Sequence, residues 1–358
     1  MNQSNFNGST DGSMESDNEK SQLTAMSSEL TFEQSAQIGN EASSLIADGK
    51  YEEALGLLDK IIHYHTYVHN LQYARALCLL NTGRLDEAKV AALSELQAFP
   101  DNQKARNMVA RIIPQYEYIP EGWAAKDRFG GWESESMEET IRKGWQSFQP
   151  TLQSLCTGGP LNKDYSAHNT MMCYAYVLAM TALKKDYISI LDYGGGACLN
   201  YLISKEIIPG VQIEYYCKET PIACKIGREI MPSVIFYEDE KCFDRKYDLV
   251  IASGSLQYLE DWQSVCERLA SVSGSYLYIT RFPMIQNIPS FVFVQRPYSL
   301  GHNTEFLGWA FNRKDFLSFI NKLGLRVLRE FMTMEGFQVV GVSEQVEYRG
   351  FLLSAGFK

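Results

Sequence analysis

The sequence predicts two folded parts, an all-α module of helical repeats followed by an α/β domain whose parallel sheet carries helices on both faces. A short motif recurs at a fixed spacing in the N-terminal third of the chain. From residue 161 onward, short apolar runs alternate with segments of helical periodicity, which is typical of a parallel sheet. At 358 residues the chain also exceeds one ordinary hydrophobic core, so we expect two domains.

The composition argues against several classes of protein. Hydrophobic residues make up 45% and charged residues 21%, as in globular proteins. The formal net charge of -10 disfavours nucleic acid or an anionic membrane as the main partner. No apolar run approaches the roughly 20 residues of a membrane span, and the start of the chain does not resemble a secretory signal. The eight cysteines form no Cys-x-x-Cys pair, so we expect reduced thiols, no metal site and a cytoplasmic location.

Changes in composition divide the chain into four stretches. We expect a disordered tail over residues 1–30 and helical repeats over 31–113. An aromatic-rich connector is expected over 114–160, and the α/β domain over 161–358. The tail is rich in Ser, Asn, Gly and Glu and lacks apolar periodicity. The connector carries Trp123, Trp132 and Trp145. Such large aromatic side chains indicate a connector that lies against a folded surface.

Residues Gly49–Ala54 and Gly83–Ala88 are two copies of one motif, 34 residues apart (83 − 49 = 34). The period and its small residues resemble the tetratricopeptide repeat. In that pattern the glycine ends the first helix of a pair, and the small residues let the helices approach closely. A further helix is expected over 102–113 as a cap or a third half-unit. Because two repeats are few for such an array, we expect the module to contact a protein partner, the following domain or a second copy.

The α/β domain contains seven expected strands with helices between most of them. The strands are expected over 187–192, 211–218, 233–237, 247–252, 275–280, 325–331 and 347–355. The helices are expected over 165–184, 197–207, 220–230, 260–271 and 313–323. We expect the last two strands to form a hairpin-like pair. Residues 282–312 are expected to form a long loop of the kind that builds substrate sites.

The stretch Ile188–Asn200 indicates a ligand site. An apolar run ends in Asp192 and is followed at once by Gly194, Gly195 and Gly196. A buried strand that ends in a turn without side chains lets a nucleotide-like ligand reach backbone N–H groups and a helix N-terminus. A tight turn without a ligand is the alternative. The spacing differs from the dinucleotide fingerprint Gly-x-Gly-x-x-Gly, and this disfavours NAD.

Acids and small residues follow the neighbouring strands. Glu219 ends the second strand, 23 residues beyond Gly196 (219 − 196 = 23), where an acid accepts hydrogen bonds from both ribose hydroxyls. The alternative is a solvated acid at a helix N-terminus. Glu238 ends the third strand, where it contacts an adenine amino group or lies in a solvated loop. Three more candidates for cofactor binding lie in the turn that ends the fourth strand: Ser253, Gly254 and Gln257.

Together these features resemble the class I S-adenosylmethionine-dependent methyltransferases. The glycine turn is similar to the first motif of that superfamily, Glu219 to its ribose acid, and Tyr247–Tyr258 to its fourth motif. The resemblance implies a Rossmann-like sheet and S-adenosyl-L-methionine as the cofactor. A narrower resemblance, over residues 122 to 320, is to a methyltransferase family of bacterial surface-polysaccharide gene clusters. Its motifs are Gly131-Trp132, Leu191–Gly195, Glu219 with Gly227, Ser253–Leu259, Ile279–Pro283 and Gly308–Phe311. This resemblance implies polysaccharide biosynthesis and a sugar or glycan precursor as the acceptor.

Methyl transfer from a sulfonium is an in-line displacement, in which the protein orients the nucleophile and removes a proton from a hydroxyl. Four residues are candidates for this chemistry: His168, Tyr258, Arg281 and His302. A histidine can act as the base near neutral pH, or it can have a structural role. Tyr258 either orients a substrate hydroxyl or packs. Arg281 suits the carboxylate of a uronate, the phosphate of a nucleotide sugar or a structural acid.

The sequence therefore favours O-methylation of a sugar or glycan precursor over N-methylation. Two other classes of function stay open. One is a catalytically silent scaffold that uses the methyltransferase fold and the repeats to bind partners, since fold alone does not imply activity. The other is a nucleotide-cofactor oxidoreductase of the Rossmann type.

Overall fold

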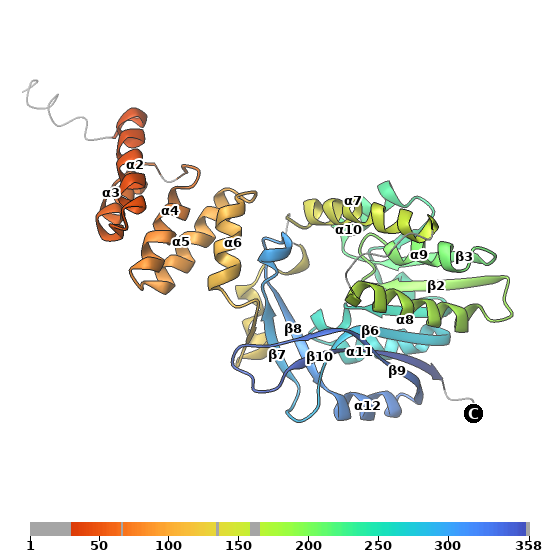
Figure 1. Ribbon diagram of the computed structural model, residues 1–358. Helices are drawn as coiled ribbons and strands as arrows, with labels where there is room; N and C mark the ends of the chain where they lie inside the picture. The colour runs from red at the N-terminus through yellow and green to blue at the C-terminus, as the bar shows by residue number, and fades with distance from the viewer. Residues whose placement is uncertain (1–29, 66, 134–135, 158–164, 356–358) are drawn as a thin grey trace, which may run out of the picture. The chain divides into compact units, whose positions relative to one another are not determined.

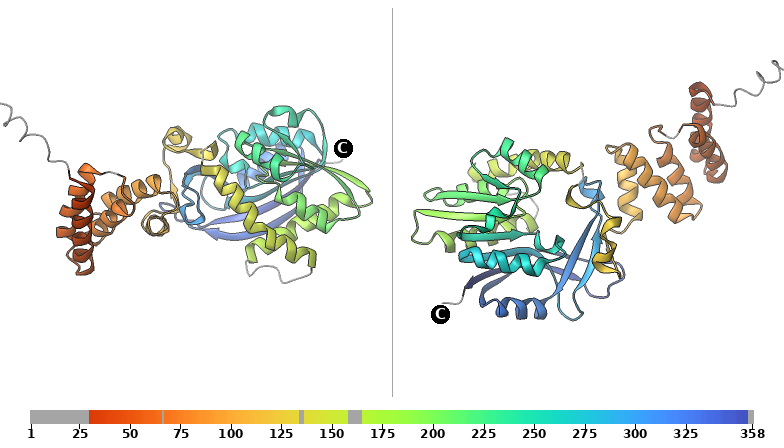
Figure 2. Two further views of the ribbon diagram at one scale, coloured as in Figure 1. Left: turned by 90° about the horizontal axis from the view of Figure 1, so that it is seen from above. Right: turned by 180° about the vertical axis from the view of Figure 1, so that it is seen from behind.

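The computed structural model describes residues 30–65, 67–133, 136–157 and 165–355. The chain forms two compact units, one ending at Ala105 and the other beginning at Arg106 (Figures 1 and 2). Of the tail expected to be disordered, residues 1–29 lie outside the described part of the chain. No described helix is long and apolar enough to cross a membrane.

The N-terminal part is helical and follows the predicted repeat. Its helices are α2 (Phe32–Ala47), α3 (Tyr51–Tyr64), α4 (Leu71–Asn81), α5 (Leu85–Ala98) and α6 (Gln103–Ile112). Gly49 and Gly83 occupy matching positions after α2 and α4, with φ of 76° and 79°, and a left-handed glycine is a common way to end a helix. The small residues of the repeat are buried at the helix contacts: Ala42, Ala54, Ala76 and Ala88.

A buried carboxylate stabilises the start of α4. Glu95 of α5 is completely buried, and its Oε1 accepts a hydrogen bond from the backbone N–H of Asn70 at 2.7 Å. Its Oε2 accepts from the N–H of Gln72 at 3.1 Å. Asn102 donates its side-chain N–H to Glu95 Oε1 at 2.7 Å. The side chain of Asn70, the N-cap residue of α4, forms no capping hydrogen bond. The Glu95 carboxylate accepts hydrogen bonds from the first N–H groups of α4 in its place.

The second unit is built on a sheet with five parallel central strands. These are β2 (Tyr187–Tyr193), β3 (Gln212–Lys218), β4 (Ile235–Tyr237), β5 (Tyr247–Ser253) and β6 (Ser273–Ile285). In space they run β4-β3-β2-β5-β6, the 3-2-1-4-5 order of Rossmann folds. Beyond β6 lies β10 (Val346–Ala355) and then β9 (Leu325–Phe337), each antiparallel to its neighbour. This is a Rossmann-like sheet, as predicted, with an antiparallel pair in place of a sixth parallel strand.

Helices cover both faces of this sheet (Figure 1). The helices are α8 (Tyr165–Ala182), α9 (Leu199–Ile207), α10 (Pro221–Ile230), α11 (Trp262–Val272) and α12 (Arg313–Lys322). Ile188 and Ile190 of β2 share a hydrophobic cluster with Leu178 of α8. Leu191 belongs to the opposite cluster, with Leu269 of α11. Alternate residues of the central strand therefore bury their side chains against different helices.

Residues 282–312 are not a loop, and that expectation was wrong. The strand β6 continues to Ile285, and β7 (Phe291–Gln295) and β8 (Phe306–Asn312) form an antiparallel pair. Most residues of β7 and β8 are buried, including consecutive ones. Because such strands are apolar on both faces, they lack the alternation that marks a half-exposed strand.

The described residues of the connector form several regular elements of the second unit. They are β1 (Tyr116–Tyr118), two short 3-10 helices (Gly122–Arg128 and Gly131–Glu133) and α7 (Ser136–Thr157). β1 pairs with β7, so it extends the sheet. Trp132 stacks on Phe306 of β8 with ring centroids 4.0 Å apart, and Trp123 lies 6.2 Å from Trp309. Trp145 packs against the cluster that contains α8 and α9.

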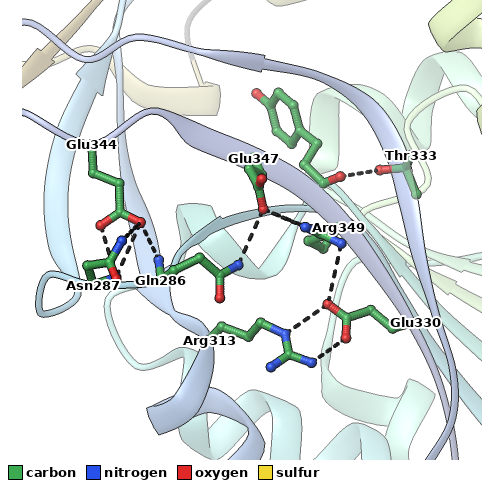
Figure 3. A network of polar contacts seen from close by, with 9 residues as sticks. Gln286, Asn287, Arg313, Glu330, Thr333, Glu344, Glu347 and Arg349 are labelled. Atoms are coloured by element: carbon green, nitrogen blue, oxygen red, sulfur yellow. Dashed lines mark hydrogen bonds and ion pairs between the residues drawn. The ribbon is translucent and has the colours of Figure 1, made fainter.

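A network of polar side chains joins β6, β9, β10 and α12 (Figure 3). Arg313 of α12 donates two hydrogen bonds to Glu330 of β9, at 3.0 and 2.5 Å. Arg349 of β10 pairs with Glu347 at 2.7 Å and lies 3.8 Å from Glu330. The Glu344 carboxylate accepts hydrogen bonds from three consecutive backbone N–H groups, those of Gln286, Asn287 and Ile288. These contacts hold the antiparallel pair against the end of β6.

Candidate functional site

The first two glycines of the turn after β2 have no room for a side chain. A Cβ added to Gly194 would lie 2.4 Å from Ser255 Cβ, and one added to Gly195 would lie 2.7 Å from Asp192 Cγ. Gly194 and Gly196 also have positive φ, of 74° and 58°. Close approach therefore requires Gly195, backbone conformation favours glycine at Gly196, and both reasons apply to Gly194.

Glu219 at the end of β3 is bonded to this turn. Its Oε1 accepts a hydrogen bond from the N–H of Gly196 at 2.8 Å, and its Oε2 accepts from the N–H of Thr220 at 2.7 Å. Gly194 donates its N–H to the carbonyl of Lys218 at 2.8 Å. The ends of two neighbouring parallel strands are thus joined at one edge of the sheet, where Rossmann folds bind their ligands.

Two cavities border the glycine turn, and both are lined by Gly194 and Gly196. The first, which we name the α8 cavity, has a volume of about 520 Å³ and is lined by α8, α9 and the end of β6. The second, the Glu219 cavity, has a volume of about 530 Å³ and includes Glu219, Ser255 and Trp132. Both volumes are typical of small-molecule sites.

Asp192 is a buried acid beneath the turn. It is completely buried, and its Oδ2 accepts hydrogen bonds from the Tyr215 hydroxyl at 2.7 Å and from Asn200 Nδ2 at 3.1 Å. Within the described residues its Oδ1 has no hydrogen-bond partner. Burial raises the pKa of Asp192 to about 6, more than these two hydrogen bonds lower it.

The turn after β5 lies against the end of β6. Ser253 lines the α8 cavity and Gly254 lines the Glu219 cavity. Gly254 has a φ of 63° and donates its N–H to the carbonyl of Thr280 at 2.9 Å. Gln257 is buried and donates Nε2 to the carbonyl of Arg281 at 3.4 Å. The structure therefore places Ser253 and Gly254 at the cavities and uses Gln257 to support the end of β6.

Three of the four catalytic candidates line a cavity. His168 of α8 and Arg281 of β6 line the α8 cavity. Tyr258 lines the Glu219 cavity, where its hydroxyl donates to Gln295 Oε1 at 2.6 Å and its ring lies edge-on to Trp132. Burial raises the pKa of Tyr258 to about 12, so its phenol stays protonated at neutral pH.

Like Asp192 and Gln257, two further predicted site residues, His302 and Glu238, line neither cavity. His302 lines neither cavity; its Nδ1 is buried without a partner among the described residues. Burial, and then the charge of Arg106, lower the pKa of His302. Glu238 forms an ion pair with Arg228 at 2.5 Å and lines neither cavity. The adenine contact that the sequence suggested for Glu238, as one of two alternatives, stays a prediction.

Sequence reasoning missed three polar residues of the α8 cavity. They are Asn200, Tyr278 and Thr280. The Tyr278 hydroxyl and Thr280 Oγ1 are buried without hydrogen-bond partners in the described part of the chain, an uncommon state for buried polar atoms. Residues two apart on a strand share a face, so this spacing was an available signal.

Residues 45–112 match the family model of the tetratricopeptide repeat. No curated protein sequence matches the chain. Three solved structures are similar. The mitomycin 7-O-methyltransferase MmcR is 15% identical, with 95% of this chain and 98% of that chain covered and a TM-score of 0.40. Human N-acetylserotonin methyltransferase in complex with SAM is 15% identical, with 79% of this chain and 70% of that chain covered and a TM-score of 0.39, and a SAM dependent methyltransferase from Aquifex aeolicus is 16% identical, with 57% of this chain and 97% of that chain covered and a TM-score of 0.36. The TM-scores all lie below 0.5, and the order and direction of the strands define the fold. The chain thus combines a helical module that matches the tetratricopeptide repeat over residues 45–112 with a domain of Rossmann-like fold.

Proposed function

We propose that this protein is an S-adenosylmethionine-dependent methyltransferase whose cofactor lies across the glycine turn. The observation that carries the proposal is the turn itself. It exposes backbone without side chains, it borders two cavities of ligand size, and it is bonded to an acid from the next strand. This combination suits a nucleoside with a long substituent, which extends from one cavity into the other.

The Glu219 cavity is proposed to hold the nucleoside. A carboxylate offers about four lone-pair sites, and backbone N–H groups occupy two of those on Glu219. The remaining sites are available to the two ribose hydroxyls. The apolar side chains of Met137, Ile141 and Leu259 also line this cavity, and they suit a flat purine ring.

The α8 cavity is proposed to hold the amino-acid end of the cofactor together with the methyl acceptor. The cofactor, when bound, supplies an electrophilic methyl group. The chain's own part is to orient the acceptor and to take its proton. Tyr278 and Thr280 line this cavity with buried hydroxyl groups that have no hydrogen-bond partner among the described residues, and His168 lines it as well. These groups support O-methylation of a hydroxyl-rich acceptor, such as a sugar or glycan precursor, with His168 as the base.

The helical module is proposed to bind a protein partner. It matches a repeat family, and it exposes apolar side chains that a folded unit would otherwise bury. Phe32 is 76% exposed and Val90 is 64% exposed.

Calorimetry with S-adenosylhomocysteine and with NADH tests the cofactor assignment. We expect S-adenosylhomocysteine to bind and NADH not to bind. Gly194→Arg is expected to abolish binding, because any side chain there meets Ser255. Glu206→Ala, at an exposed acid of α9, is the control and is expected to bind normally. Wild-type protein that binds no S-adenosylhomocysteine at millimolar concentration would refute the proposal.

A further inference from the structure

The strand β6 has a bulge beside the glycine turn. On β10, Gly350 lies between the residues that pair with Phe282 and with Ile279, so this one residue faces both Thr280 and Arg281. As a result Ile279 and Phe282, three positions apart, belong to the same hydrophobic cluster. In a regular strand they would point to opposite faces. The extra residue of β6 is Arg281.

The backbone of Arg281 is strained. Its φ is 52°, in the left-handed region, where a residue with a Cβ is disfavoured and bulges often place glycine. Arg281 is also exposed, so the strained backbone is not offset by burial of the arginine side chain. Strain of this kind is concentrated at sites that bind ligands, and bulges beside such sites re-aim a side chain.

In the described part of the chain, the guanidinium of Arg281 has no acidic partner. Arg281 lines the α8 cavity, and its Cζ lies 3.5 Å from the position of a Cβ on Gly254. Among the residues that the structure describes, no carboxylate forms an ion pair with it. Its charge acts on the phenols of Tyr116, Tyr258 and Tyr348, where it opposes the increase in pKa that burial causes.

We propose that Arg281 binds an oxyanion, a carboxylate or a phosphate, on a ligand in the α8 cavity. A guanidinium presents a planar fork of N–H donors that fits both groups, and the bulge holds this fork beside the turn. The inference rests on the proposed function, which makes the cavity a ligand site. The oxyanion belongs either to the methyl acceptor, which is then an acidic molecule, or to the amino-acid end of the cofactor.

Calorimetry on the full chain separates the two sources. Three probes are used: S-adenosylhomocysteine, 5′-methylthioadenosine, which lacks the amino-acid carboxylate, and inorganic phosphate added with and without saturating S-adenosylhomocysteine. The variants are Arg281→Gln and Arg281→Gly. Lys184→Gly is the matched control, because Lys184 has a φ of 59° and lines neither cavity.

Both glycine variants are expected to unfold at the wild-type temperature or a few degrees higher, because glycine adopts positive φ without strain. Only the Arg281 variants are expected to lose oxyanion binding. At least tenfold weaker phosphate binding, with unchanged affinity for both nucleosides, assigns the oxyanion to the acceptor. At least tenfold weaker S-adenosylhomocysteine binding, with unchanged methylthioadenosine binding, assigns it to the cofactor.

Wild-type affinities for all three probes in both Arg281 variants would overturn the inference. A failure of the proposed function looks different. Wild-type protein would then bind no S-adenosylhomocysteine, whereas phosphate binding to the protein alone would still be lost on replacement of Arg281.

Discussion

The Glu219 carboxylate accepts a hydrogen bond from the backbone N–H of Gly196 at 2.8 Å. This bond joins the end of β3 to the glycine turn after β2, so the proposed ribose acid also holds the proposed cofactor loop in place. The two roles can be separated by measuring ligand binding and folding stability on the same variants.

Glu219→Ala is expected to weaken S-adenosylhomocysteine binding by at least tenfold and to lower the free energy of unfolding. The variant leaves the part-buried N–H groups of Gly196 and Thr220 without their acceptor. Water can reach such donors, so the loss of stability is expected to stay below the roughly 1–3 kcal/mol of a fully buried unpaired donor. Calorimetry and urea unfolding measure the two effects. Glu206→Ala should change neither, and an unchanged affinity in Glu219→Ala would contradict a ribose contact.

Gly195→Ala is expected to destabilise the protein by about 1–3 kcal/mol, the usual cost of overpacking. The backbone of Gly195 is not left-handed, so the cause would be contact alone: the new Cβ would lie 2.7 Å from Asp192 Cγ and 3.0 Å from Cys217 Sγ. The matched control is Gly210→Ala, where a Cβ meets nothing within 4 Å. Urea unfolding should show a lower free energy of unfolding for Gly195→Ala and an unchanged one for Gly210→Ala. Equal values for the two variants would show that the turn tolerates a side chain.

Asp192→Asn is expected to change the pH dependence of stability. Burial raises the pKa of Asp192 from 3.8 to about 6, so the folded state favours the protonated acid. That stabilisation is complete below the unfolded pKa and is lost as the pH rises through about 6. An asparagine keeps the site neutral. The free energy of unfolding of the variant, measured relative to wild type, should therefore increase by on the order of 3 kcal/mol between about pH 4 and pH 8.

Urea unfolding at both pH values measures this gain. Asp127→Asn, at an exposed residue, serves as the control, and its difference from wild type should not vary with pH. If the difference between Asp192→Asn and wild type also did not vary with pH, the Asp192 carboxyl would have the same pKa in the folded and unfolded protein, which would contradict the prediction.

Glu95→Ala is expected to destabilise the helical module by about 1–3 kcal/mol. The N–H groups of Asn70, Gln72 and Tyr73 would lose their acceptor inside the module. Hydrogen exchange on the full chain should be faster at these three amides. Exposed Glu53→Ala should leave their exchange unchanged, and unchanged exchange in Glu95→Ala would show that the cap is not needed.

Much of the fold was predictable because its signals are local. The strands β2 and β5 are apolar runs bounded by glycine or turn residues, and the repeat has a fixed period that places Gly49 and Gly83 at the same point of two helix pairs. The strands β7 and β8 were missed for the opposite reason. Their burial depends on pairing with each other and with β1 and β6, and no local alternation reports such pairing.

The sequence by itself determined the glycine turn, the acid after β3 and the helical repeats, because these depend on backbone conformation and short spacing. Only the tertiary structure decided which side chains share a cavity. It brings Tyr278 and Thr280 to the turn and pairs Glu238 with Arg228. The bulge at Arg281 also has no local signal, since it arises from the pairing of β6 with the distant Gly350. Contacts between residues far apart in the chain are set by packing, which local sequence patterns do not encode.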